Sequence, residues 1–314
     1  VSDILVNPDG SVWVDSSHGL ERTDVTLSAS EARALATRLA SLGNRRLDDA
    51  MPWADAQLPG NLRFHGMLPP LSAGGASISL RRAAALPYSL DDLEASGTLT
   101  ASGRALVEAI IHARLSFLVS GGTGSGKTTL LGAMLGAVDP RERMIIVEDA
   151  TELRPVHPHV VHLQARHANA EGVGEISLAT LIRQCLRMRP DRIIVGECRG
   201  EDIRELLQAL NTGHEGGCGT LHANTAADVP ARLEALGALA GLDPLALASQ
   251  ALSAITVVLH MHRSREGRSL STISLLQRGV DGRLECIPAV SFGARERRFP
   301  AFEALEARLA HGGA

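Results

Sequence analysis

Residues 121–128 read Gly-Gly-Thr-Gly-Ser-Gly-Lys-Thr and match the eight-residue template of a phosphate-binding loop. In such a loop, free backbone N–H groups and the N-terminus of the next helix face a phosphate. The glycines let the backbone curl without a Cβ in the way. Lys127 would then reach the β- and γ-phosphates, and the Thr128 hydroxyl would bind Mg²⁺. The expected nucleotide-binding residues are Gly121, Gly122, Thr123, Gly124, Ser125, Gly126, Lys127, Thr128 and Thr129.

The chain contains thirty arginines and a single lysine, Lys127. A compact ammonium fits inside a tight phosphate cradle, whereas a planar guanidinium fork does not. Every other permanently charged basic side chain is an arginine. We therefore interpret Lys127 as functional rather than incidental.

Two apolar runs end in acidic residues. Residues 144–147 precede Glu148 and Asp149, and residues 193–195 lead to Glu197. Acids at the carboxyl ends of parallel strands beside a phosphate loop lie where α/β sheets hold their ligands. A carboxylate there can orient the attacking water or hold Mg²⁺, directly or through water. For Glu148 and Asp149, a solvated loop after the strand is the alternative. The candidate Mg²⁺ ligands are Thr128, Glu197 and Asp149.

A glycine-rich segment, residues 211–224, carries His214 and His222 on either side of a short expected strand. A histidine beside the γ-phosphate can sense it by hydrogen bonding. Two histidines satisfied locally within a loop are an equally good interpretation of the sequence alone.

Two other sets of residues are interpreted structurally. The arginines between residues 183 and 204 are nearly balanced by acids, so we expect a solvated or ion-paired face. Four histidines between residues 157 and 167 lack the spacing that is typical of a zinc site.

The order of the predicted elements indicates an α/β protein. A strand at 115–120 and a helix from 129 flank the loop, and a helix from Thr100 leads to that strand. Upstream, a turn at 7–10 predicts a hairpin, and Ser28 with Glu31 predicts a capped helix ending near Gly43. Three strands and a short helix are expected after residue 255. The predicted division is an N-terminal α/β domain (1–82), a linker (83–99) and an ATPase domain (100–314).

Composition limits the functional classes. A net charge of −4 gives no global attraction to nucleic acid, and two tryptophans, one tyrosine and five phenylalanines cannot form an extended stacking platform. The four cysteines form no C-x-x-C pair, which favours buried free thiols in a reducing cytoplasm. No apolar run reaches the ~20 residues of a membrane span. The chain opens directly on a strand-like run at residues 4–6, which is consistent with a fragment of a longer protein.

Four ordered segments together resemble the type II/type IV secretion ATPase superfamily, most closely its CpaF/TadA-like branch, which serves tight-adherence (Flp-type) pilus assembly. The segments are Ser120–Thr129, Ile146–Leu153 (the Asp box), Leu186–Gly200 (the Walker B region) and Gln208–Asn224 (the His box). The stretches Asp3–Asn7 and Leu68–Arg82 are also similar to the family, so the resemblance covers nearly the whole chain.

The resemblance implies a RecA-like core, a PAS-like N-terminal domain, and a hexameric ring that binds ATP and Mg²⁺ between domains. By position, Glu148 is similar to the glutamate that activates water, Glu197 to the Walker B acid, and His222 to the His-box histidine near the γ-phosphate. Arg63 and Arg81 lie where the family places arginines that reach the nucleotide. Arg82 adjoins Arg81, and the resemblance leaves open which of them points to ATP.

The sequence also departs from the family. Glu215 replaces an aspartate, Gly217-Cys218 replaces a larger pair, and residues 58–65 differ from the usual Pro-Asp-Gly-Ser-Arg-Val-Asn pattern. The tetracysteine zinc motif of the type II branch is absent.

We therefore expect a Mg²⁺-dependent ATPase, a hexameric motor for pilus assembly or protein secretion across the bacterial envelope. It would be cytoplasmic, held at the inner membrane through platform proteins, and would need no nucleic acid. A RecA-like nucleic-acid translocase and a scaffold that binds nucleotide but turns over little are the alternatives. The sequence does not separate pilus assembly from secretion, nor give the cargo or the direction of work.

Overall fold

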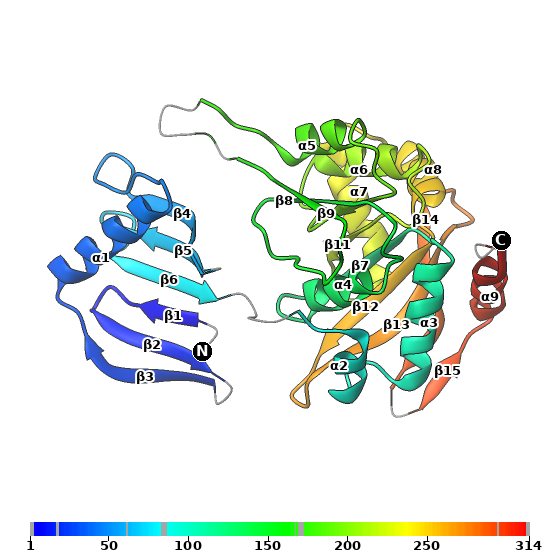
Figure 1. The fold of residues 1–314 in the computed structure, drawn as a ribbon, viewed down its shortest axis with the longest axis horizontal. Coiled ribbons are helices and arrows are strands. Elements are labelled where there is room, and N and C mark those ends of the chain that lie inside the picture. Colours follow the sequence, from blue (N-terminus) through cyan, green and yellow to red (C-terminus); the bar gives the residue numbers. More distant parts are fainter. Residues whose placement is uncertain are drawn as a thin grey trace. The chain divides into compact units, whose positions relative to one another are not determined.

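The computed structural model describes residues 3–16, 19–60, 62–82, 87–166, 168, 173–293 and 295–311. The chain divides into two compact units (Figure 1). The first comprises residues 1–86 and 167–175, and the second comprises residues 87–166 and 176–314. The predicted linker differs from this division, because its residues 87–99 belong to the second unit, where Leu90, Leu93 and Leu99 are buried in the core.

The first unit is a six-stranded antiparallel sheet with one helix, α1 (Ala29–Leu42), against one face. The strand order is β3-β2-β1-β6-β5-β4. Ser28 and Glu31 form the predicted capping box, and Ala32, Ala36 and Ala40 let α1 approach the sheet closely. The strands are β1 (Asp3–Val6), β2 (Ser11–Ser16), β3 (Gly19–Thr26), β4 (Trp53–Leu58), β5 (Leu62–Met67) and β6 (Ser77–Arg82).

The second unit is built on a nine-stranded sheet of order β15-β14-β13-β12-β7-β11-β10-β8-β9. The six strands from β12 to β9 run parallel, and the other three are antiparallel. The strands are β7 (Phe117–Gly121), β8 (Met144–Glu148), β9 (Val160–Gln164), β10 (Arg192–Val195), β11 (Cys218–His222), β12 (Val257–Arg263), β13 (Arg268–Arg278), β14 (Leu284–Phe292) and β15 (Glu296–Arg298).

Helices cover both faces of this sheet, because the central strands are apolar on both sides. One face packs against α2 (Leu90–Ala95), α3 (Ala101–His112), α4 (Lys127–Gly136) and α9 (Ala301–His311). The other packs against α5 (Leu178–Cys185), α6 (Asp202–Leu210), α7 (Val229–Leu239) and α8 (Pro244–Ala254). The predicted α/β class, with a smaller N-terminal domain beside a P-loop core, is confirmed.

Among the described residues, no single helix is long and apolar enough to cross a membrane. Residues 226–239 and 244–254 pass that test only as a pair, and the pair is bent by 117°.

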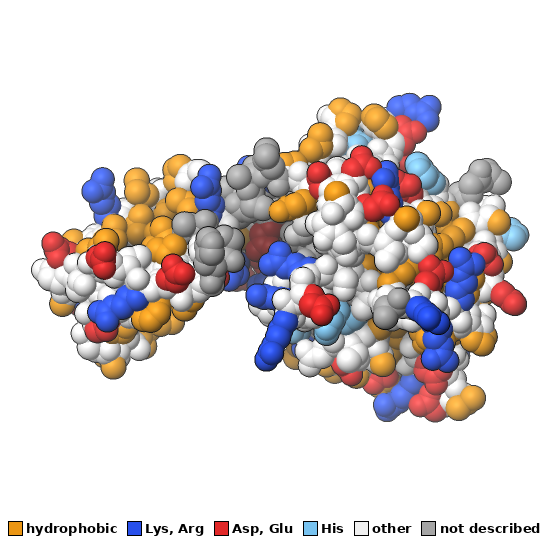
Figure 2. All heavy atoms as spheres, turned by 90° about the horizontal axis from the view of Figure 1, so that it is seen from below, with side chains coloured by type: hydrophobic (Ala, Val, Ile, Leu, Met, Phe, Trp, Pro, Cys, Tyr) orange, Lys and Arg blue, Asp and Glu red, His pale blue; other side chains and the backbone are white. Residues whose placement is uncertain are grey.

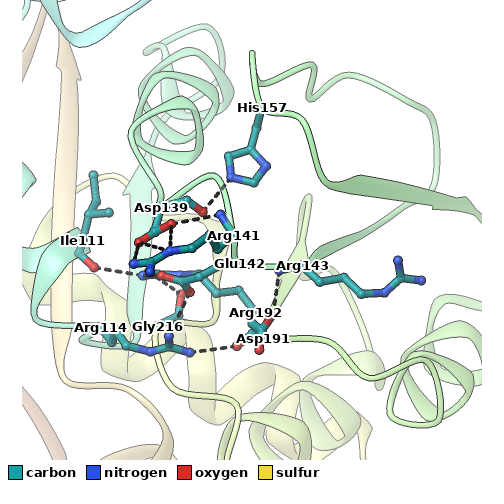
Figure 3. A network of polar contacts seen from close by, with 10 residues as sticks. All are labelled: Ile111, Arg114, Asp139, Arg141, Glu142, Arg143, His157, Asp191, Arg192 and Gly216. Carbon is teal, nitrogen blue, oxygen red and sulfur yellow. Dashed lines mark hydrogen bonds and ion pairs between the residues drawn. The ribbon is translucent and has the colours of Figure 1, made fainter.

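A buried ion pair joins several segments at the amino-terminal edge of the parallel strands (Figure 3). Arg192, the first residue of β10, is 2% exposed and donates to both carboxylate oxygens of Glu142, at 2.8 and 3.0 Å. Its guanidinium also donates to the carbonyls of Ile111 (3.0 Å) and Gly216 (3.4 Å), while Arg114 pairs with the same glutamate at 3.1 Å. The interpretation of the 183–204 arginines as ion-paired therefore holds for Arg192, which is also buried.

Replacing Glu142 with alanine is expected to destabilise the second unit by about 3–5 kcal/mol, because the Arg192 charge would stay buried without its partner. Chemical unfolding followed by circular dichroism would measure the loss. Asp139→Ala is the matched control, since Asp139 pairs with the exposed guanidinium of Arg141 in the same loop and should change stability little. Equal losses in the two variants would contradict the role of burial.

Candidate nucleotide-binding site

The strands that carry the predicted site residues end at one edge of the sheet. Strands β7, β11, β10 and β8 are consecutive neighbours and all run parallel. His222 of β11 is in register with Gly121 of β7, and Val195 of β10 is in register with Val147 of β8. The loop after each strand therefore begins at the same edge, as the sequence predicted for a ligand site.

Glycines shape the phosphate loop. Gly124 and Gly126 have φ angles of 69° and 96°, which side chains rarely adopt. A Cβ on Gly121 would lie 2.5 Å from both the Met261 carbonyl oxygen and Ser125 Oγ. At the start of α4, no side chain caps the first N–H groups. Ser125 Oγ is also buried without a partner among the described residues. The loop thus has the unfilled donors that an anion such as a triphosphate requires.

Lys127 lies folded into this loop. Its Nζ donates to the carbonyl oxygens of Gly121 and Gly122, both at 3.0 Å. Burial lowers its pKa, while the charge of Glu197 raises it and that of Arg199 lowers it. The ammonium therefore lies at the loop and within electrostatic reach of the Walker B region.

Glu148 ends β8 and is only 4% exposed. Its Oε1 accepts the backbone N–H groups of Glu152 (3.1 Å) and Leu153 (3.0 Å). A Cβ on Gly196 would lie 2.6 Å from Glu148 Cγ, so the glycine directly after the neighbouring strand β10 is what admits this side chain. Burial raises the pKa of Glu148 to about 7, against the lowering effect of those N–H groups. Such a carboxyl can accept a proton near neutral pH.

Glu197 follows β10 and is bound by Arg199, one of the arginines that were expected to be ion-paired. Arg199 Nη2 donates to Glu197 Oε2 at 2.6 Å. This bond raises the pKa of Arg199, and the charges of Asp149 and Glu152 raise it further. The two loops therefore share one charged neighbourhood. The sequence signal for the Arg199–Glu197 pair is an arginine two residues after the Walker B acid.

The donor set fits Mg²⁺ bound together with phosphates. The described residues hold no group of three or more histidine, cysteine or acidic side chains that could bind a metal by itself. Mg²⁺ usually binds one or two carboxylates plus substrate phosphates and water. Thr128, in the first turn of α4, with Glu197 and Asp149 could supply that share.

The two predicted histidines, His214 and His222, lie at opposite ends of β11. His222 lies at the carboxyl end of β11, where the next residue, Ala223, donates its N–H to Gly121 O at 3.4 Å. His214 precedes β11, and its Nδ1 lies 3.0 Å from the Ala209 carbonyl oxygen. His214 is therefore hydrogen-bonded within its own segment, whereas His222 lies next to the phosphate loop.

Sequence reasoning missed His260 of β12. This side chain is 5% exposed, and its Nδ1 lies 2.9 Å from Ser120 Oγ, directly before the phosphate loop. Burial lowers its pKa, and a hydrogen bond to the backbone of Asn224 opposes that shift. His260 thus links the loop strand to the segment after β11. The only signal in the sequence was a histidine enclosed by the apolar residues Leu259 and Met261.

His157 and His159 are bonded to each other, and His157 also reaches the loop after α4. His157 Nε2 lies 3.0 Å from the Asp139 carbonyl oxygen (Figure 3), and the His159 N–H donates to His157 Nδ1. His167 lies outside the described residues. The four cysteines are free thiols, and Cys286 is the one that is not fully buried.

Arg63 and Arg81 lie in the first unit, as cross-strand neighbours on β5 and β6. Both lie on the sheet face opposite α1, because the alternate residues Phe64 and Leu80 belong to the core. Arg81 Nε donates to Asp3 Oδ1 at 2.8 Å. The neighbouring Arg82 belongs to the opposite face, so the two adjacent arginines are separated by the pleat of the strand.

Charged side chains of both signs are interspersed on the face drawn in Figure 2. Several arginines after residue 182 form internal ion pairs. Arg183 binds Glu205 at 2.7 Å, in addition to the Arg199 and Arg192 pairs described above.

Comparison with known proteins gives one family. The family described as "Type II/IV secretion system protein" matches residues 1–274. The "Putative conjugal transfer protein Rv3659c" of Mycobacterium tuberculosis is 53% identical over 294 residues, which are 91% of this chain and 83% of that protein. The "Probable conjugal transfer protein TrbB" of Sinorhizobium fredii is 34% identical over 291 residues, which are 91% of this chain and 86% of that protein.

Among solved structures, the "Pilus Retraction Motor PilT and Bound ADP" aligns with a TM-score of 0.60. The alignment covers 98% of this chain and 83% of that one, at 19% sequence identity. This likeness concerns the fold.

Proposed function

The chain belongs to the type II/IV secretion system protein family and is an ATPase of it, and we propose that it is a Mg²⁺-dependent motor for pilus assembly or secretion. The strongest support for the proposal is the way in which three site residues converge. The lysine of the phosphate loop, a buried glutamate with a pKa of about 7 and a second acid, Glu197, lie at the ends of neighbouring parallel strands.

In the proposed mechanism, the first-turn N–H groups of α4 and the Lys127 ammonium bind the triphosphate. The ammonium exchanges the carbonyls of Gly121 and Gly122 for phosphate oxygens, whose growing charge it then stabilises. The Glu148 carboxylate accepts a proton from the attacking water. Thr128 and Glu197, with Asp149 through water, would hold Mg²⁺, whose charge neutralises the phosphates. Arg199 then releases Glu197, and His222 senses the γ-phosphate.

The assembly we propose is a homohexamer. An arginine of the N-terminal unit, Arg81 or Arg63, would complete a nucleotide site and couple domain rotation to hydrolysis, as arginine fingers do. The Arg81–Asp3 pair would have to open for this, at little cost because the Arg81 side chain is 68% exposed. The ring would work at the cytoplasmic face of the inner membrane, on platform proteins embedded there.

Two lines of support bear on the branch. The motif resemblance favours the CpaF/TadA-like branch and hence tight-adherence pilus assembly. The relatives at 53% and 34% identity are named for conjugal transfer. Pilus assembly and conjugal transfer both move material across the bacterial envelope. We therefore propose the activity that they share, which is ATP hydrolysis that powers this movement.

A nucleic-acid translocase is less well supported. Three of the arginines that would contact phosphates, Arg183, Arg192 and Arg199, are already paired with glutamates of this chain. Surface charges of both signs on the face in Figure 2 also give little attraction for a polyanion.

Phosphate release from Mg²⁺·ATP by the purified chain tests the proposal. We expect hydrolysis without DNA, and no stimulation when duplex DNA is added at low salt. Stimulation that falls steeply with added salt would support the translocase instead, because such binding releases counterions. Nucleotide binding without turnover in either condition would support a scaffold.

A further inference from the structure

The hairpin between β12 and β13 carries two arginines against the phosphate loop. Arg263 and Arg268 are cross-strand partners at the base of its turn. Arg268 Nε donates to the Gly124 carbonyl oxygen at 2.9 Å. A Cβ on Gly124 would lie 2.9 Å from Arg263 Nη1, so the second guanidinium lies over the same glycine.

The bond from Arg268 fixes one peptide plane of the loop. In a trans peptide, the C=O of Gly124 and the N–H of Ser125 point in opposite directions. With the Gly124 carbonyl held by the guanidinium, the Ser125 N–H points the opposite way and donates to Gly122 O at 3.3 Å. Gly122 O also accepts Lys127 Nζ. Arg268 therefore fixes a peptide plane whose N–H is bonded to the same carbonyl that accepts Lys127 Nζ.

The charge of this pair is not compensated within the described part of the chain. Neither guanidinium forms an ion pair with a carboxylate there, whereas Arg183, Arg192 and Arg199 each do. Both side chains belong to exposed residues. Two uncompensated cations beside an anion-binding loop raise the local potential and so favour a polyanionic ligand.

We propose that the β12–β13 hairpin is a second arm of the nucleotide site. Arg268 is a positioning residue for the loop, and Arg263 binds the phosphate chain of the nucleotide. The inference rests on the proposed function, because it takes the ligand of residues 121–128 to be a nucleoside triphosphate. It adds two binding residues that lie more than a hundred positions downstream of the loop.

The dissociation constant of a fluorescent ATP analogue, measured by anisotropy with Mg²⁺, tests the pair. Arg268→Ala and Arg263→Gln are each expected to weaken binding about tenfold, as for a lost charge-assisted hydrogen bond. Arg268→Lys should recover part of the affinity, because it keeps the charge. The Arg263→Gln variant should also show a shallower dependence of affinity on salt. Arg265→Ala, in the same turn, removes an equal charge and should leave affinity unchanged.

The outcomes separate this inference from the proposed function. Wild-type protein that fails to bind the analogue would overturn both. Wild-type binding with unchanged affinity in Arg268→Ala and Arg263→Gln would overturn the inference alone. So would an Arg263→Gln variant that binds normally but loses self-association in mass photometry, since the guanidinium would then contact another copy of the chain. Equal thermal unfolding midpoints for all the variants exclude a folding defect as the cause of weaker binding.

Discussion

Lys127→Ala is expected to abolish ATP hydrolysis, lowering the rate by at least about a hundredfold, and to weaken nucleotide binding. The ammonium lies inside the phosphate loop, bonded to the Gly121 and Gly122 carbonyls. The sequence has no other lysine, and Arg199, whose charge acts on the pKa of Lys127, is bound to Glu197. Phosphate release and analogue binding would measure the two losses.

Lys127→Arg sharpens this test. It keeps the positive charge, but a planar fork has to replace a compact ammonium between two carbonyls of a tight loop. We expect its hydrolysis to fail as well, even though arginine provides every other basic side chain. Full turnover in Lys127→Ala would refute the assignment of the site. Turnover in Lys127→Arg alone would show that charge, and not shape, explains the single lysine.

Glu148→Gln is expected to bind nucleotide normally and to hydrolyse it about a hundred to a thousand times more slowly. The amide oxygen can still accept the N–H groups of Glu152 and Leu153, so the loop should keep its shape. What is lost is the group that accepts a proton. Parallel failure of binding and hydrolysis would instead make Glu148 a structural residue or a metal ligand.

The dependence of the rate on pH gives an independent measurement. Because burial raises the folded pKa of Glu148 to about 7, the carboxyl is protonated and inactive as a base below that pH. Wild-type turnover should therefore rise about tenfold between pH 6 and pH 8, and the residual rate of Glu148→Gln should not. Glu152→Gln is the control. The charge of Glu152 raises the pKa of Glu148, so this variant should keep its turnover and shift the midpoint to lower pH.

Local patterns predicted those parts of the site that are continuous in sequence. The phosphate loop, the capping box at Ser28 and the strands ending at Glu148 and near Glu197 are each specified within a few residues. The convergence of the acids could be expected from parallel pairing. The pKa of Glu148 could not, because it depends on Gly196, the residue directly after another strand, which admits the side chain into a buried position.

The misses share a cause, which is contact between distant segments. His260 reaches Ser120 across 140 positions, and Arg268 reaches Gly124 across 144. The burial of Arg192 depends on a glycine, Gly216, because a Cβ there would lie 2.5 Å from Nη1. The short helix expected within the linker forms as α2, capped by Ser89 and Asp92, but the packing of Leu90 and Leu93 on the second unit's core depends on distant apolar partners. No local spacing contains this information.

The position of the Arg192 pair bears on how such a protein could adapt. Arg192 is in register with Met144, four residues before Glu148 on β8, so it lies about 13 Å from Glu148 along the strands, beyond the range at which substitutions usually interact. Changes around Glu142 and Arg192 should therefore add to, rather than modify, the effects of changes at Glu148 and Glu197. Selection for heat tolerance could act on one end of the strand while selection for turnover acts on the other, with neither trait limiting the other.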